Sequence, residues 1–278
     1  MSEPVGIGVR CAGVVHIYPA SGEDLDDVVA LRGIDLDVDP GEFVSLLGPS
    51  GSGKSTVLGL LAGVLRPSAG RVLIGPHDVG RMAPRALARL RGSVVALVLQ
   101  TPARNLLPYA TVRQNVAFAA GPSGGSVDAL LEGLGLAALA DRVVGGLSGG
   151  EQQCVAIAAA LSSGAQLVLA DEPTSQLDAA GRERVMDLLA QVHGEFGRTV
   201  VLVTHDPSVA GRSARTVTIR DGRVGSEGVH GREYAVVGRD GSLQLPPEVF
   251  EEFPAGTLLE IRRDGSEITL IPRSEESS

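Results

Sequence analysis

Nine consecutive residues have the types and the spacing that a phosphate-binding loop needs. They are Gly48, Pro49, Ser50, Gly51, Ser52, Gly53, Lys54, Ser55 and Thr56, and they fit the pattern G-x-x-x-x-G-K-[ST]. The glycines allow the backbone to curl, so that successive N–H groups point at phosphate oxygens in front of a helix N-terminus. Lys54 would reach the β- and γ-phosphates of a nucleoside triphosphate, and the Ser55 hydroxyl would be a ligand of Mg²⁺.

The sequence around this loop supports that interpretation. Residues 43–47 (FVSLL) are a short apolar run of strand type, and residues 56–65 carry apolar side chains at helical spacing. Of the 24 Lys and Arg residues, Lys54 is the only lysine. A compact ammonium fits between phosphates where a planar guanidinium does not. A Gly/Ser-rich surface turn would not explain a Lys–Ser pair between two apolar elements.

Three titratable side chains follow apolar runs that we predict to be strands. Asp171 and Glu172 end the run at 166–170, and His205 ends the run at 199–204. Because parallel strands present their carboxyl ends at one sheet edge, these side chains should lie beside the phosphate loop. We assign Asp171 to the Mg²⁺ side, Glu172 to positioning or deprotonating a water, and His205 to the same catalytic edge.

Two further side chains allow more than one interpretation. Gln100 ends the apolar run at 94–99, and its amide could join the Mg²⁺ ligands or orient a water. Tyr18 lies upstream of the phosphate loop, where it could stack on a purine ring or be a half-buried tyrosine at a strand end. The residues themselves leave both questions open.

A second stretch with anion-binding chemistry contains Ser148, Gly149, Gly150 and Glu151. It opens a helix that we predict to run to about residue 161. Ser148 can cap this helix, and the two glycines expose backbone N–H groups near its N-terminus, which attracts anions. Taken alone, the stretch is also an ordinary helix cap.

The composition excludes several classes of protein. A net charge of −9 and a pI near 5.1 argue against a general binder of nucleic acids or anionic membranes, whose surfaces are basic. Cys11 and Cys154 lie far apart among apolar residues, so we expect reduced, packed thiols. The N-terminus lacks a signal-peptide pattern, and no run reaches the ~20 apolar residues that a membrane span needs.

Strand-like runs alternate with helical segments over most of the chain, which predicts an α/β fold. Two strand-like runs, at 5–18 and 28–38, precede the phosphate loop. Residues 101–146 contain short helical segments and no periodic strand pattern, so we expect a helical insertion there. A chain of 278 residues accommodates one large domain and one small one.

Taken together and in this order, the motifs resemble those of ATP-binding subunits of ABC transporters. The matching positions are Tyr18 (A-loop), 48–56 (Walker A), Gln100 (Q-loop), 147–153 (signature), 167–172 (Walker B with the catalytic Glu172), 175–178 (D-loop, with Asp178) and His205 (switch histidine). The stretches LSGGEQQCVAIAAAL, ADEPTSQLD and RNLLPYATVRQNV are similar to the lipoprotein-release and macrolide-export branch. Cys154 and Ala159 stand where that branch usually has Arg, and Gln114 stands where it has an acid.

The resemblance implies a P-loop NTPase fold of the ABC ATPase type within residues 1–228. This fold has a RecA-like core, an antiparallel β subdomain and a helical subdomain at about residues 101–162. The resemblance also implies that two subunits clamp two ATP molecules head to tail, with Mg²⁺ held through Ser55, Gln100 and Asp171. The phosphate loop of one subunit would face Ser148, Gly149 and Gly150 of the other, with Glu151 and Asp178 beside them.

The implied partners are a second copy or a homologous ATPase subunit, and a transmembrane permease. The permease would hold the chain at the cytoplasmic face of the cell membrane, and the acidic charge makes nucleic acid an unfavourable partner. The resemblance favours export, or extraction of lipoproteins or lipids from the membrane. The alternative is a soluble ATP-switched regulator whose C-terminal domain contacts protein or DNA.

Residues 229–278 differ in composition from the rest, and we predict that they form a small β-rich domain with a disordered end. The predicted elements are strands at 234–237, 243–245, 258–262 and 267–271, and a short helix at 248–253. Their pattern resembles swapped-hairpin domains of the transition-state-regulator and antitoxin type. Residues 232–278 contain five Arg and ten Asp or Glu, and so short a unit buries little surface alone. We therefore expect a dimerising or regulatory role rather than DNA binding.

Overall fold

The structure is a computed structural model that describes residues 6–20, 26–121, 125–229, 232–239, 241–245, 249, 252–253, 256–265 and 267–272. Three of the six residues of the predicted helix at 248–253, which are 248, 250 and 251, lie outside the described residues. Among the helices that are described, none is long and apolar enough to cross a membrane.

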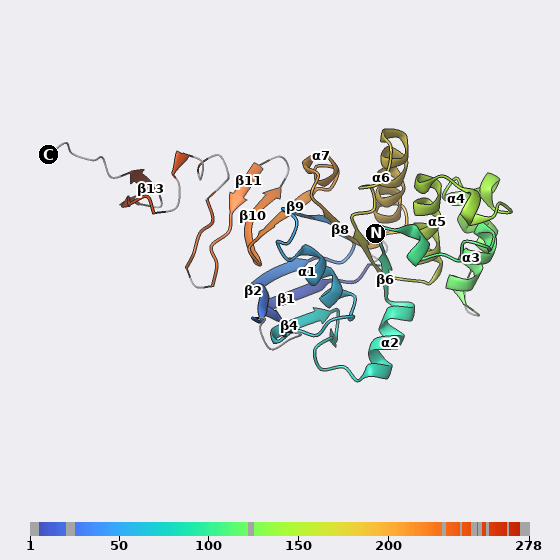
Figure 1. The fold of residues 1–278 in the computed structure, drawn as a ribbon, viewed down its shortest axis with the longest axis horizontal. Helices are drawn as coiled ribbons and strands as arrows, with labels where there is room; N and C mark the ends of the chain where they lie inside the picture. Colours follow the sequence, from blue (N-terminus) through green and yellow to red (C-terminus); the bar gives the residue numbers. More distant parts are fainter. Residues whose placement is uncertain are drawn as a thin grey trace.

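A seven-stranded sheet with the order β11-β10-β9-β3-β8-β7-β6 runs through the described part of the chain (Figure 1). Its strands are β3 (Phe43–Leu47), β6 (Val95–Val98), β7 (Leu167–Asp171), β8 (Thr199–Thr204), β9 (Arg215–Arg220), β10 (Arg223–Val229) and β11 (Arg232–Ala235). The pairs from β6 to β9 are parallel, whereas β9, β10 and β11 form an antiparallel meander. Every residue of β8 is buried, as expected for a parallel strand covered on both faces.

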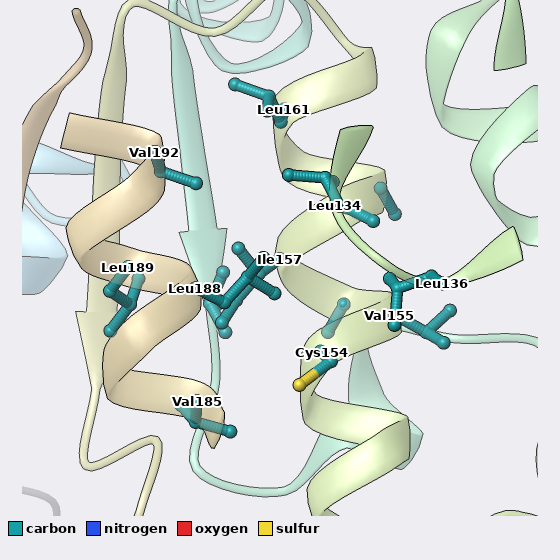
Figure 2. Packing of buried hydrophobic residues seen from close by; sticks show 14 of the residues in the cluster. Leu134, Leu136, Cys154, Val155, Ile157, Leu161, Val185, Leu188, Leu189 and Val192 are labelled. Carbon is teal, nitrogen blue, oxygen red and sulfur yellow. The ribbon is translucent and has the colours of Figure 1, made fainter. Parts of the chain in front are cut away.

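The two faces of this sheet belong to two separate cores, because successive side chains on a strand point in opposite directions. Leu169 and Val201 pack with helix α1 (Lys54–Leu61) and a smaller sheet. Val168 and Val200 pack with helices α5 (Gly149–Ser162) and α6 (Ala179–Gly194). Figure 2 shows this second core, with Ile157 of α5 beside Leu188 of α6. The central sheet therefore lies between two apolar layers.

The smaller sheet is antiparallel and has the order β2-β1-β4-β5. Its strands are β1 (Val9–Tyr18), β2 (Val28–Val38), β4 (Ala69–Ile74) and β5 (His77–Asp78), and helix α2 (Pro84–Ser93) follows it in the chain. Leu31 and Ile34 of β2 are fully buried in the core that α1 shares. This sheet corresponds to the antiparallel β subdomain that the sequence predicts.

In its described residues, the segment predicted to be a helical insertion contains short helices, turns and an isolated β-bridge between Thr111 and Val143. Its elements are η1 (Pro102–Arg104), α3 (Val112–Ala120), α4 (Val127–Gly133), η2 (Ala137–Leu139) and η3 (Val144–Gly146). They pack on α5 through one apolar cluster that includes Val116, Leu131 and Val155. A short helix α7 (Pro207–Ala210) follows β8. The α/β fold class with its antiparallel and helical parts is thereby confirmed.

The C-terminal region divides differently from our prediction. The strand predicted at 234–237 is β11, and it pairs with β10 at the edge of the central sheet, because its backbone satisfies the open edge of β10. The strand predicted at 243–245 is reduced to a single bridge between Val237 and Leu243. Strands β12 (Leu259–Asp264) and β13 (Glu267–Pro272) form a separate hairpin. Figure 1 shows this hairpin at the far end of the molecule from α3 and α4.

Candidate functional site

The phosphate loop connects β3 to α1 and curls as the sequence predicts. Gly53, at the N-terminus of α1, has a left-handed backbone with φ of 104°. Gly48 approaches β9 so closely that a Cβ atom on it would lie 2.1 Å from the carbonyl oxygen of Ile219. Lys54 Nζ donates to the carbonyl oxygens of Gly48 and Pro49 at 2.7 and 2.8 Å, so its ammonium spans the mouth of the loop.

Burial lowers the pKa of Lys54, while the carboxylates of Glu172 and Asp171 act in the opposite direction. The side chain is only 6% exposed. Desolvating an ammonium is unfavourable unless anions surround it. An anionic ligand would offset the cost of burying this ammonium, which agrees with the phosphate-binding role predicted for Lys54.

A turn between β9 and β10 supports the loop from the other side. The Gly222 N–H donates to the Ser52 carbonyl oxygen at 3.0 Å, and the Gly222 carbonyl accepts from the Arg32 N–H at 2.8 Å. Asp221 and Gly222 both have positive φ, at 48° and 72°, as in the turn that joins two adjacent antiparallel strands. Sequence reasoning missed this contribution, although an Asp-Gly pair between two strand-like runs is a turn signal.

Asp171, at the end of β7, lies beside the first turn of α1. Ser55 Oγ donates to Asp171 Oδ1 at 3.3 Å. Burial raises the pKa of Asp171, Glu172 raises it further, and the Ser55 hydrogen bond and Lys54 lower it. A hydroxyl and a carboxylate oxygen at this separation are hard donors of the kind that Mg²⁺ prefers, so these residues fit the ion.

Glu172 and His205 form the closest contact at this edge. His205 Nδ1 lies 2.9 and 2.8 Å from the two Glu172 carboxylate oxygens. Glu172 has a positive φ of 49°, and its N–H donates to the Val203 carbonyl oxygen at 2.9 Å, so the strained backbone is held by β8. The sequence placed both residues at one edge, and the structure adds that they touch.

Gln100 lies at the same edge of the sheet but forms no hydrogen bond with Ser55 or Asp171. Its Nε2 donates to Ser175 Oγ at 3.0 Å, and Ser175 Oγ donates to the Glu172 carbonyl oxygen at 3.0 Å. Gln100 is thus linked through Ser175 to the Glu172 backbone, and no hydrogen bond joins it to Ser55 or Asp171, where the sequence predicts the metal ion.

Tyr18, at the end of β1, lies above the start of α1. Its hydroxyl is 3.3 Å from Thr56 Oγ1, and the His16 ring packs edge-on against it with centroids 4.6 Å apart. The side chain is 39% exposed, so one face of the ring remains open to solvent. This arrangement agrees with the predicted stacking of the Tyr18 ring on a purine base.

Apart from Asp171, which does not line it, these side chains surround one open cavity of about 640 Å³. Its lining also includes residues that the sequence did not indicate, which are Val28, Val29, Ala30, Arg32, Asp221 and Gly222. The volume lies within the range of ligand and cofactor sites, about 300–1,000 Å³. A lysine at one end and an open tyrosine at the other suit a ligand with phosphates and an aromatic base.

The second predicted anion site lies elsewhere in the same chain. Ser148 caps α5 in a reciprocal capping box with Glu151, and Asp178 Oδ1 accepts from the Gly181 N–H at 2.8 Å to cap α6. Gly150 approaches α6 so closely that a Cβ atom on it would lie 2.9 Å from the Gly181 Cα. A separate cavity of about 480 Å³ lies at these two helix N-termini. It shares no lining residue with the first cavity.

The three departures from the family pattern each have a local explanation. Cys154 is buried in the seam between α5 and α6, where burial raises the pKa of its thiol to about 11 and keeps it unreactive (Figure 2). Gln114 completes a capping box with Thr111, a task that a glutamine performs as well as a glutamate. Ala159 is only 7% exposed and packs in the apolar core.

Comparison with known families and curated proteins gives one consistent result. A family model described as "ABC transporter" matches residues 31–175. The lipoprotein-releasing system ATP-binding protein LolD of Anaeromyxobacter dehalogenans is 41% identical over 84% of this chain and all of its own length. The macrolide export ATP-binding/permease protein MacB of Chromobacterium violaceum is 40% identical over 79% of this chain. The chain spans only about a third of that relative, 34% of its length.

Comparison with solved structures gives the same result as the sequence comparisons. A dimeric post-hydrolysis state of the ATP-binding cassette MJ0796 bound to ADP and Pi matches with a TM-score of 0.68 and 34% identity, over 83% of this chain and 99% of that one. A second dimeric structure of MJ0796, described as a bacterial ABC transporter cassette, matches with a TM-score of 0.70 and 33% identity, over 81% and 100% of the two chains.

The packing of the loop against β9 can be tested with two glycines of the loop. In Gly48→Ala the new Cβ meets the Ile219 carbonyl oxygen at 2.1 Å, so the loop must move, and we expect the free energy of unfolding to fall by at least about 3 kcal/mol. In Gly51→Ala nothing lies within 4 Å of the new Cβ. Only the positive φ of 80° is unfavourable for alanine, and it should lower the free energy of unfolding by about 1–2 kcal/mol. Urea unfolding of both variants measures the difference, and equal losses would contradict the close packing.

Proposed function

The chain belongs to the ABC transporter family as an ATP-binding subunit, and we propose that two copies of it hydrolyse ATP head to tail in order to drive a separate membrane permease. One observation carries the head-to-tail part of this proposal. The loop cavity and the Ser148–Asp178 cavity both suit phosphate, yet they lie apart in one chain. A two-fold arrangement of two copies, as in the dimeric relatives, would bring each loop against the other copy's second site.

In this proposal each residue at the loop has a separate task. The loop N–H groups and Lys54 bind the β- and γ-phosphates, and Tyr18 stacks on the base. Ser55 and Asp171 hold Mg²⁺, which when bound neutralises part of the phosphate charge. Gln100, which contacts Ser175 here, is our prediction for a further oxygen ligand.

The hydrolytic step then depends on Glu172 and His205. The Glu172 carboxylate accepts a proton from water as the water oxygen bonds to the γ-phosphorus, and the bond from that phosphorus to the β,γ-bridging oxygen breaks. ADP and phosphate leave, and the phosphate no longer bridges the two copies. His205, at 2.8 Å, holds the carboxylate in position before nucleotide is bound.

The relatives suggest what the ATPase drives. Their names describe lipoprotein release and macrolide export, and we infer that this chain likewise powers export or extraction of lipoprotein-like or lipid-like molecules. We place the chain at the inner face of the cell membrane through a permease. Tyr109 and Phe118 support this contact, because each is 77% exposed beside η1 and α3, and exposed aromatic side chains are typical of interfaces.

Glu172→Gln tests the base. The amide keeps the shape of the side chain but cannot accept the proton, so ATP binding should persist while turnover falls by about 10²–10⁴. Glu183→Gln is the matched control, because Glu183 pairs with Arg212 on the outside of α6. This variant should hydrolyse ATP at the wild-type rate. A phosphate-release assay and nucleotide binding are the measurements, and wild-type turnover in Glu172→Gln would remove Glu172 from this role.

Ser148→Arg tests the shared site. In the Glu172→Gln background, ATP should convert monomer to dimer, and the added bulk and charge at the start of α5 should prevent this. Ser163→Arg, at the opposite end of the same helix, should leave the ATP-dependent dimer unchanged. Light scattering measures the dimer fraction. All of these variants also carry Ile261→Glu in the C-terminal hairpin, so that only the ATP-dependent contact is measured. A dimer that forms equally well with Ser148→Arg would contradict the head-to-tail arrangement.

The permease contact is tested by changing the two exposed aromatics together, as Tyr109→Ser with Phe118→Ser. Basal ATP hydrolysis should stay unchanged, because neither side chain lines the ATP cavity. Stimulation of hydrolysis by the co-purified permease should fall at least about tenfold, in line with the loss of interface hot spots. Val64→Ser, also an exposed apolar residue at 62%, is the control. Unchanged stimulation in the double variant would place the contact elsewhere.

A further inference from the structure

Exposed apolar side chains gather in the C-terminal region. Among the described residues, seven of the thirteen large exposed apolar side chains lie between residues 232 and 272. They are Tyr234, Val237, Leu243, Leu258, Ile261, Ile268 and Leu270. Such a concentration in a short segment indicates an interaction surface.

The hairpin of β12 and β13 carries three of these side chains, Ile261, Ile268 and Leu270, on one face. Ile261 pairs directly with Leu270, Leu259 with Pro272, and Arg263 with Ile268, and directly opposed residues share a face. We call the side chains of Leu259, Ile261, Ile268 and Leu270 the apolar hairpin face.

The opposite face of the hairpin is mostly polar, and Ile271, which is opposite Glu260, is the apolar side chain among its ladder positions. Glu260 and Arg262 lie on it and form an ion pair at 3.0 Å, and Thr269 is opposite Arg262 in the ladder. The hairpin is therefore amphipathic.

The rest of the described chain leaves the apolar hairpin face open. Ile261 is 71% exposed and Ile268 68% exposed, and Figure 1 shows the hairpin beyond β11, apart from both sheets. An isolated two-stranded hairpin is at best marginally stable in water, and needs further strands or a packing surface. None of the described residues covers this face, and a second copy of the chain can supply the covering surface.

The segment before the hairpin attaches it to a defined place on the main body. β11 pairs with β10, and Arg239 donates two hydrogen bonds of 2.6 Å to the Asp35 carboxylate on β2. These bonds are the main cause that lowers the pKa of Asp35. Every copy of the chain thus carries an identical apolar face from the same point of attachment.

Charge favours a second copy over a nucleic acid or an anionic membrane. Residues 258–272 contain three acids (Glu260, Asp264, Glu267) and two arginines (Arg262, Arg263), so two such hairpins repel one another little. Residues 232–278 as a whole have a net charge of −5, from five Arg and ten acids, which opposes any polyanion. The dimeric relatives place two cassettes in one particle, which raises the effective concentration of one hairpin for the other.

We propose that the apolar hairpin face docks on the same face of a second copy of this chain, and so holds two copies together when no nucleotide bridges their ATP sites. A face of four apolar side chains is smaller than the ~800 Å² per partner of a standard interface. The contact is accordingly weak, and we expect it to hold two copies together without nucleotide at micromolar concentrations of the chain.

The test is sedimentation velocity of the full chain without nucleotide, at roughly 1–100 μM, a range that covers weak interfaces. The variants are Ile261→Glu and Leu270→Glu, which place a charge within the face. The control is Thr269→Glu, which adds the same charge one residue away on the polar face. We expect a concentration-dependent dimer for wild type and Thr269→Glu, and at least ~10-fold weaker association for the other two variants.

Several results would overturn the proposal. They are a monomeric wild-type chain over this range, unchanged association in both face variants, or equal loss in Thr269→Glu. Salt-sensitive binding of duplex DNA at micromolar wild-type protein and ~0.15 M salt, lost in Ile261→Glu, would assign the face to a different occupant. The ATP-dependent dimer of Ile261→Glu in the Glu172→Gln background reports separately on the proposed function, because its interface lies at Ser148 and the phosphate loop.

Discussion

The parallel pairing of β3, β8 and β7 is the constraint on which the ATP site depends. Its register sets Leu47 beside Thr204 and Asp171 beside Val203, so the strands end together at one edge. The phosphate loop, the two acids and His205 begin where those strands stop. Alternate side chains of the same strands anchor two separate cores, and therefore any shift of one strand would disturb both the packing and the site.

The second constraint is the close approach of α5 and α6. Gly150 and Gly181 allow the two N-termini to meet, and Ser148 and Asp178 cap the N–H groups there. The two helices also share the apolar seam that contains Cys154 (Figure 2). The position of the signature site is thus determined by helix packing, while the position of the phosphate loop is determined by the sheet. Such independent supports are consistent with the proposal that the two sites contact different nucleotides in a pair of copies.

The C-terminal region is joined to the ATP site by backbone contacts. The turn at Asp221 and Gly222 supports the phosphate loop through Ser52, and the strand that leaves this turn, β10, is the strand with which β11 pairs. The Arg239–Asp35 ion pair attaches the same segment to β2, whose Arg32 N–H bonds the turn. A hairpin that joins two copies would therefore act on strands that border the nucleotide cavity.

The sequence by itself determined the chemistry of the site, because the loop, the Asp171–Glu172 pair and the capped start of α5 depend on contiguous residue types and local geometry. It also predicted the edge at which His205 lies, since buried strands of apolar residues can be recognised from composition. Contacts between distant segments were decided only by the tertiary structure. The attachment of Gln100 to Ser175, the contact of the 221–222 turn with the loop, and the pairing of β11 with β10 are examples. Each contact depends on which groups the packed sheets bring within hydrogen-bonding distance. The spacing of residues along the sequence does not specify these contacts.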